Sequence, residues 1–193
     1  MENRKSQIIE LALKNIREKG YLSFSYDDLA KELGVTKASI HYHFMRKEDL
    51  GLAVCTKLKE GLEKSYLNIE QAQIKIEDKP WEFMSRRAKQ IGNNEVCPLS
   101  SLQADFNFLP EAMQVGVQQL SQMEIDYLEK LLEDIKQEGK LKITQDTGAL
   151  AGLLISSIKG ALQYRRVVGE DLYSIVFDQL KLLVHGNNEI RHK

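Results

Sequence analysis

The stretch that most constrains this chain is residues 25–50, SYDDLAKELGVTKASIHYHFMRKEDL. Ser25 is a typical helix cap, and Asp28 three residues later gives a pattern close to a capping box, with Asp in place of Glu. Gly34 suits the left-handed end of one short helix, and Thr36 suits the cap of the next. Two short helices joined by a tight turn predict a helix-turn-helix, whose second helix fits a DNA major groove.

The side chains of this motif separate into an inward and an outward set. Leu29, Ala30 and Leu33 form an inward stripe on the first helix, and Ile40 and Phe44 do so on the second. A helix as short as the second is unstable alone, so packing must hold it and its other face is free to serve a ligand. The outward positions are Lys37, Ala38, Ser39, His41, Tyr42 and His43. An ordinary helical corner would also explain the caps and the turn. The polar, aromatic and basic outward run favours DNA binding.

Length and composition favour an all-helical protein. The chain has 193 residues, which is enough for one or two compact units, and only three prolines. No apolar run is long enough to cross a membrane, and the N-terminus has no signal-peptide pattern. Its two cysteines, Cys55 and Cys97, suit a reducing cytoplasm rather than a disulfide framework. We therefore expect a cytoplasmic protein with no membrane partner.

The charge balance limits how DNA binding would work. Residues 1–60 carry 11 Lys and Arg against 9 Asp and Glu, a net of +2, whereas residues 61–193 carry 16 against 19, a net of −3. The chain therefore lacks a strongly basic field. Binding would depend on a few placed cations, and doubling the motif in a dimer would help.

The apolar periodicity predicts about nine helices in two domains. Residues 1–50 form a three-helix DNA-binding head, and residues 51–193 form a larger helical bundle for effector binding and dimerisation. The helices outside residues 25–50 are expected at 4–19, 47–71, from Pro80, 99–107, 110–138, 146–168 and 172–185, followed by a polar tail from Gly186.

The last two predicted helices are more apolar than one internal face requires. Part of this surface is expected to form a two-fold interface of four helices, two from each subunit. The alternative is a deep core for the C-terminal region alone. The residues assigned to the interface are Leu150, Leu154, Ile158, Ala161, Ile175, Val176, Leu180 and Leu183.

The head resembles the tetracycline-repressor (TetR/AcrR) family of bacterial transcriptional regulators. The resemblance covers about residues 4–52 and rests on the segments at 18–21, 28–37, 40–44 and 47–50. It implies that Thr36, Lys37, Ala38 and Ser39 face the groove and that Lys37 reads guanine. It also implies that Tyr42, His43 and Lys47 contact phosphates. His41 stands where the family usually has an aromatic residue, most often Tyr, and Arg46 replaces a commonly small polar residue.

The resemblance further implies a homodimer on a palindromic double-stranded operator and a small-molecule effector bound by the C-terminal domain. A repressor released by that effector is the leading interpretation, and a constitutive dimeric DNA-binding protein without an effector is the alternative. Aromatic and Met side chains suit an apolar ligand, although any helical core would use the same types. The residues assigned to the pocket are Trp81, Met84, Cys97, Phe106, Phe108, Met123, Tyr127 and Tyr164.

Cys97 is also a candidate thiol sensor. The segment 97–105 resembles a short helix in one subgroup of the same family, some members of which respond to electrophiles or oxidants. Cys97 would cap a helix opened by Pro98, where unpaired amides stabilise a thiolate. A packed structural thiol is the alternative, because Glu95 is near and no basic residue is adjacent.

The sequence offers no pattern for catalysis or for a cofactor. It has no nucleophile–base constellation, no metal-ligand spacing and no glycine-rich phosphate loop. His41 and His43 stand two positions apart on one helix, so their side chains point in different directions. We therefore expect neither an enzyme nor a metalloprotein.

Overall fold

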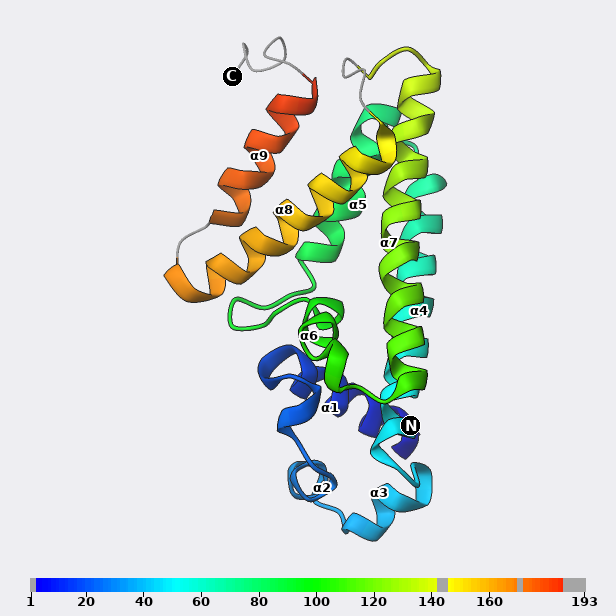
Figure 1. The fold of residues 1–193 in the computed structure, drawn as a ribbon, viewed down its shortest axis with the longest axis vertical. Helices are drawn as coiled ribbons and strands as arrows, with labels where there is room; N and C mark the ends of the chain where they lie inside the picture. Colours follow the sequence, from blue (N-terminus) through cyan, green and yellow to red (C-terminus); the bar gives the residue numbers. More distant parts are fainter. Residues whose placement is uncertain (1–2, 142–145, 170–171, 186–193) are drawn as a thin grey trace. The chain divides into compact units, whose positions relative to one another are not determined.

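The computed structural model describes residues 3–141, 146–169 and 172–185, and this part of the chain is helical without strands (Figure 1). The predicted all-α class is confirmed, with nine α-helices in the described residues. The predicted polar tail from Gly186 lies outside them. The elements are α1 (Arg4–Lys19), η1 (Tyr21–Ser23), α2 (Tyr26–Leu33), α3 (Lys37–His43), α4 (Lys47–Glu70), η2 (Ile76–Asp78), α5 (Lys79–Ala88), α6 (Pro98–Ala104), η3 (Phe106–Phe108), α7 (Glu111–Gln137), α8 (Thr147–Val168) and α9 (Leu172–His185).

The chain divides into two compact units. The head unit comprises Met1–Gly61 and Glu95–Ser121, and the C-terminal unit comprises Leu62–Asn94 and Gln122–Lys193. Helices α4 and α7 each contribute one part to both units. The head unit therefore contains α6 and the start of α7, a segment that sequence reasoning assigned to the C-terminal domain beginning at residue 51.

The core of the head unit is built from the apolar stripes of its helices. Ile8 and Ile16 of α1, Leu29 of α2, Ile40 of α3 and Leu50 of α4 are fully buried. Burying a side chain of this size stabilises a fold by about 1.5–3 kcal/mol. This packing holds α2 and α3, which are too short to be stable as isolated helices.

Helix α6 packs against α1 through polar contacts as well as apolar ones. The Ser101 hydroxyl donates a hydrogen bond to the Ile16 carbonyl at 2.8 Å, and the Val96 N–H donates to the Arg17 carbonyl at 3.0 Å. The last carbonyls of a helix lack partners within that helix. Val96 supplies a partner for the Arg17 carbonyl, and Ser101 adds a second one to the Ile16 carbonyl, which also accepts from the Gly20 N–H; these contacts join residues 95–104 to the head unit.

In the C-terminal unit, α8 and α9 pack against each other, and α5 also contacts α8. Leu150 and Leu154 of α8 and Leu180 and Val184 of α9 are buried. No helix in the described ranges is both long enough and apolar enough to cross a membrane.

Candidate nucleic-acid interface

The helix-turn-helix is fixed by the caps that the sequence predicts. The Ser25 N–H donates to Oδ2 of Asp28 at 2.7 Å, and the Asp28 N–H donates to Ser25 Oγ at 3.3 Å, completing a capping box. The hydrogen bonds from Ser25 lower the pKa of Asp28. Gly34 has a φ of 64°, in the left-handed region, which ends α2 and turns the chain toward α3.

Helix α3 is anchored on one side and open on the other. Thr36 caps it by accepting a hydrogen bond from the Ser39 N–H at 3.3 Å. Ile40 is fully buried, as is Phe44 just after the helix. This orientation turns the first residues of α3 to solvent: Thr36, Lys37 and Ala38 are exposed, and Ser39 is half-buried.

The aromatic and basic residues of α3 extend the exposed surface. Tyr42 is 86% exposed, and His43 beside it is half-buried, with the two rings 5.1 Å apart. Lys37 forms an exposed ion pair with Asp27 of α2, with Nζ and Oδ2 2.7 Å apart. Exposed pairs of this kind contribute at most about 1 kcal/mol, so Lys37 can exchange Asp27 for a nucleic-acid acceptor at low cost.

His41 makes contacts that explain why an imidazole is accommodated at this position. Its ring stands edge-on to Tyr26 of α2, with centroids 4.8 Å apart, and its Nδ1 lies 3.2 Å from the Met45 carbonyl. His41 therefore bridges α2 and the end of α3 while remaining exposed. In the described residues, no group of three or more His, Cys, Asp or Glu side chains could hold a metal ion.

Lys47 is placed differently from the phosphate contact that the resemblance implies. Its ammonium turns inward and donates hydrogen bonds to the carbonyls of Tyr21, at 2.6 Å, and Phe24, at 2.5 Å. It lies over both of those rings, 4.6 and 4.4 Å from their centroids. Burial lowers the pKa of Lys47. In this geometry Lys47 holds η1 against α4, and two of its three ammonium donors are bonded to backbone carbonyls rather than free for a phosphate.

The turn η1 is held from its other side by Asp105. The Asp105 carboxylate accepts hydrogen bonds from the N–H groups of Tyr21, at 3.0 Å, and Leu22, at 3.4 Å. The carbonyl of Tyr21 meets Lys47, so η1 lies between an anion at its N–H groups and a cation at its carbonyls. We call Asp105, η1 and Lys47 the η1 clamp. Through η1 it ties the start of α4, directly after the helix-turn-helix, to Asp105, which lies 83 and 84 positions after the η1 residues it bonds.

Sequence reasoning did not assign a DNA contact to Arg46. Its exposed side chain stands between α3 and α4, where it pairs with Asp49 at 3.0 Å and Glu48 at 3.1 Å. Its N–H donates to Asp49 Oδ2 at 2.9 Å, which caps α4, and the side-chain contact with Arg46 lowers the pKa of Asp49. The sequence signal that could have drawn attention to Arg46 is its place directly before a helix whose first turn carries Glu48 and Asp49.

The residues assigned to the effector pocket do not all lie in one unit. Cys97, Phe106 and Phe108 belong to the head unit, whereas Trp81, Met84, Met123, Tyr127 and Tyr164 belong to the C-terminal unit. Trp81 and Met84 are buried, and Met123, Tyr127 and Phe106 are half-buried. Phe108 is 76% exposed and Tyr164 63% exposed, so these two do not line an interior in this structure.

Two aromatic contacts in the C-terminal unit involve these residues. Tyr127 stacks on Tyr66 with ring centroids 4.3 Å apart, and Trp81 meets Phe177 edge-on at 5.7 Å. The first contact joins α7 to α4, and the second joins α5 to α9.

Both cysteines are buried free thiols. Cys97 stands at the N-cap of α6, as the Pro98 pattern predicts, without a capping hydrogen bond from its side chain. Burial raises the pKa of the Cys55 thiol to about 11, so Cys55 stays protonated and unreactive at neutral pH.

The residues assigned to a dimer interface divide by helix face. Leu150, Leu154, Ile158 and Ala161 of α8 and Leu180 of α9 are buried within the chain itself. Val176 is half-buried. Ile175 and Leu183 of α9 are 65% and 64% exposed. The buried five leave no free surface for a partner. The other exposed apolar residues of these helices are Leu153, Tyr164, Val167 and Val168, which sequence reasoning did not assign to the interface.

Comparison with known proteins places the head among known regulators. Residues 8–54 match the family model described as bacterial regulatory proteins, tetR family. The biofilm operon icaADBC HTH-type negative transcriptional regulator IcaR of Staphylococcus epidermidis is 39% identical over 46 residues, 24% of this chain and 25% of that protein. The match thus spans about a quarter of the length of this curated relative.

Solved structures extend the likeness to nearly the whole chain. A TetR transcriptional regulator from Legionella pneumophila has a TM-score of 0.87 and 26% identity, covering 95% of this chain and 98% of that one. AibR, solved in complex with isovaleryl coenzyme A and operator DNA, has a TM-score of 0.76 and 16% identity, covering 95% and 98%. The second likeness concerns the fold alone.

Proposed function

The chain belongs to the TetR family of bacterial regulatory proteins, and from this premise we propose that it is a transcriptional repressor whose α3 enters the major groove of its operator. The observation that carries the proposal is the open face of α3, which lies opposite the buried Ile40. Proteins of this family are transcription factors rather than enzymes. Chromosomal DNA as the target gives the protein a cytoplasmic place of action.

We assign the contacts with DNA by exposure and chemistry. Thr36, Lys37, Ala38 and Ser39 read base edges, with Lys37 donating to guanine acceptors. Tyr42 and His43 contact phosphates. Lys47 is replaced in this role by Arg46, because the Lys47 ammonium is held by two carbonyls and the Arg46 guanidinium is exposed. His41 positions α3 against Tyr26.

The repressor acts as a homodimer on a palindromic operator. Leu153 on α8 and Ile175 and Leu183 on α9 are exposed apolar side chains of the kind that mark protein interfaces. On α8, Gly152 and Gly160 have no atom within 4 Å of the position of an added Cβ, which leaves room for the close approach of a second helix. A two-fold dimer presents two α3 helices to half-sites about 34 Å apart.

A small molecule bound by the C-terminal unit releases the repressor. It acts by having different affinities for the DNA-binding form and for another arrangement of the dimer. Of the residues assigned to its pocket, Trp81 and Met84 on α5 have aromatic and thioether side chains suited to an apolar ligand, and both are buried in the ligand-free protein. The structural neighbour AibR, in complex with isovaleryl coenzyme A and operator DNA, is a precedent for both ligands on this fold.

The experiment that tests the proposal is a mobility-shift titration with DNA from upstream of the protein's own gene, at moderate salt. We expect a specific, saturable shift that Lys37→Ala weakens. Binding no tighter than to unrelated DNA would overturn the proposal. Specific binding that no candidate effector reverses would favour the constitutive alternative, a dimeric DNA-binding protein without an effector.

Modification of Cys97 is the other route to release. Its place at the N-cap of α6 supports a role in the head unit, because α6 bonds to α1. The variant Cys97→Ser decides the question. If oxidants or electrophiles release the wild type and the variant from DNA equally, Cys97 is not the sensor.

A further inference from the structure

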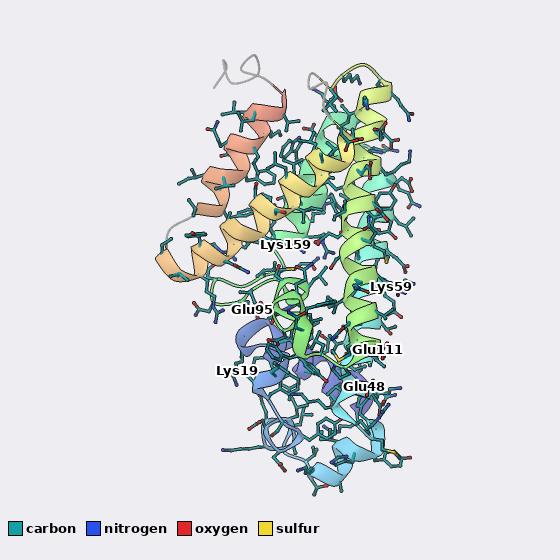
Figure 2. The ribbon with its side chains drawn as sticks, in the orientation of Figure 1. Lys19, Glu48, Lys59, Glu95, Glu111 and Lys159 are labelled. Atoms are coloured by element: carbon teal, nitrogen blue, oxygen red, sulfur yellow. The ribbon has the colours of Figure 1, made fainter. Side chains whose placement is uncertain are left out.

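A cluster of buried charge lies within the C-terminal unit, where side chains of α5, α7 and α8 meet. Glu124 of α7 is the one acidic or basic residue in the described ranges that is classed as buried. The Lys159 ammonium of α8, labelled in Figure 2, contacts Oε2 of Glu124. Nη2 of Arg87 on α5 lies 4.0 Å from Oε1 of the same carboxylate. One acid is therefore approached by two bases from two other helices.

The charges of this cluster do not balance. Lys159 is 15% exposed and Arg87 is 24% exposed at the side chain, so solvent screens both cations only in part. Two positive charges face one negative charge, which leaves an excess of one positive charge. Charges withdrawn from water are stabilised by partners of opposite sign, and an uncompensated one is costly. The balance is restored by one further negative charge.

Arg87 is the member of the cluster whose donors are not used in hydrogen bonds to the described residues. The distance of 4.0 Å between Nη2 of Arg87 and Oε1 of Glu124 is longer than a hydrogen bond. Within the part of the chain that the structure describes, the Arg87 guanidinium donates no hydrogen bond. Its remaining contact is the Phe83 ring, 5.9 Å from the guanidinium carbon. A guanidinium presents a planar pair of donors that matches the two oxygens of a carboxylate.

The surface of α5 beside Arg87 is apolar. Phe83 and Met84 lie four and three positions earlier, so they share a side of the helix with Arg87, and both are buried. Ile158 of α8, next to Lys159 in sequence, is also buried. The side of α5 that carries Arg87 is therefore apolar, and its Phe83 and Met84 side chains are already covered by the protein's own packing.

We propose that Arg87, with Lys159 and Glu124, recognises the carboxylate of a monoanionic ligand. The carboxylate pairs with Arg87 and neutralises the cluster. A neutral ligand would leave the excess charge in place, and a cation would increase it. The inference rests on the proposed function, because it names the chemical class of the effector, and it adds that the ligand is held by α5 and, through Glu124, joined to α7 and α8.

The test is thermal unfolding of the full chain with acetate, benzoate and decanoate, each compared with its neutral methyl ester. We expect at least one carboxylate to raise the Tm of the wild type while its ester does not. Arg87→Gln is expected to weaken that carboxylate at least tenfold. The matched control is Arg86→Gln, one position earlier on α5, where Arg86 forms an exposed pair with Glu82; it is expected to respond like the wild type.

A second measurement separates recognition from a purely structural cluster. Removing an excess cation relieves repulsion, so Arg87→Gln should leave the ligand-free Tm unchanged or raise it. A structural role predicts a lower Tm. The proposal is overturned if no carboxylate stabilises the wild type more than its ester, or if Arg87→Gln keeps the response. The assay contains no DNA, so failure of operator binding in the mobility shift would be a separate result that overturns the proposed function.

Discussion

Helices α2 and α3 of the head unit and helices α8 and α9 of the C-terminal unit use their surfaces in opposite ways. In α3 a single side chain, Ile40, is fully buried, and the outer face is polar, aromatic and basic. In α8 and α9 the inner face is buried and the outer face still carries apolar residues such as Leu153 and Leu183. What a helix leaves exposed after packing indicates its partner, and we propose nucleic acid for the first pair of helices and protein for the second.

The two units also treat charge differently. In the head unit, Lys37 and Asp27 form an ion pair in solvent, as do Lys14 and Glu32. Such pairs are weak and exchange readily for other partners. In the C-terminal unit, Glu124 is buried and its cations have little access to water. The exposed pairs of the head unit can therefore exchange partners readily, whereas we propose that the C-terminal unit discriminates between ligands by their charge.

The largest effect is expected from placing charge on the apolar face of α9. The double variant Ile175→Glu, Leu183→Glu removes two exposed apolar side chains from the proposed interface, a loss of about 3 kcal/mol or roughly hundredfold in dimer affinity. Analytical ultracentrifugation and mobility shifts should show a monomer with weak operator binding. Gln179→Glu, an exposed position on the same helix, adds charge without removing apolar surface and should remain dimeric. A double variant that stays dimeric would contradict the comparison.

Loss of the Asp105 carboxylate should affect the head unit next most strongly. Asp105→Ala leaves the N–H groups of Tyr21 and Leu22 without their charged acceptor, which is expected to cost about 2 kcal/mol in the free energy of unfolding. Chemical denaturation measures this loss. Gln103→Ala, on the helix that ends just before Asp105, removes only an exposed hydrogen bond to Ser121 and serves as the control. Equal losses in the free energy of unfolding for the two variants would show that the η1 clamp stabilises the head unit no more than an exposed hydrogen bond does.

A pair of lysine variants sharpens the distinction between reading DNA and holding the head. Lys37→Ala should weaken specific binding about tenfold, since a good base contact discriminates by about 1–3 kcal/mol. Lys47→Met should instead lower the free energy of unfolding and leave the salt dependence of binding unchanged, because its ammonium bonds to carbonyls rather than phosphates. If Lys47→Met reduces the salt dependence and leaves stability intact, Lys47 turns outward on DNA.

The smallest effect concerns the cap of α2. Ser25→Ala is expected to cost about 1 kcal/mol of stability near neutral pH. Because the bonds from Ser25 lower the pKa of Asp28, the folded state binds this proton less tightly than the unfolded chain does. That stabilisation is present above the unfolded pKa and is lost as the pH falls through the folded pKa. Denaturation curves of wild type and variant should therefore converge in acid, and a constant difference would refute this coupling.

Local signals predicted most of the fold. Helix α1 at residues 4–19 and helix α9 at residues 172–185 coincide with the expected ranges, and the Ser25 and Thr36 caps form as expected. These features depend on residues three or four positions apart, which a sequence displays directly.

Features that depend on distant residues were not predictable in this way. The Lys47 ammonium turns toward carbonyls 23 and 26 positions earlier, and Asp105 bonds to N–H groups 83 and 84 positions away. The residues assigned to the dimer face include buried as well as exposed positions, for a different reason. A helix that is apolar on both sides has no contrast that tells its inner stripe, such as Leu150 and Leu154, from its outer one.

The η1 clamp has a consequence for modularity. A recombinant head that ends with α4 would lack Asp105 and the residues of α6 that bond to the last carbonyls of α1. Its polypeptide would contain the whole helix-turn-helix yet only part of the unit that supports it. A functional chimera that joins this DNA reader to a foreign sensor domain must therefore carry residues 95–121 across the fusion, although they lie more than 40 positions beyond the motif. In this chain the DNA-binding unit that could be transferred to another protein is made of two separate stretches of sequence.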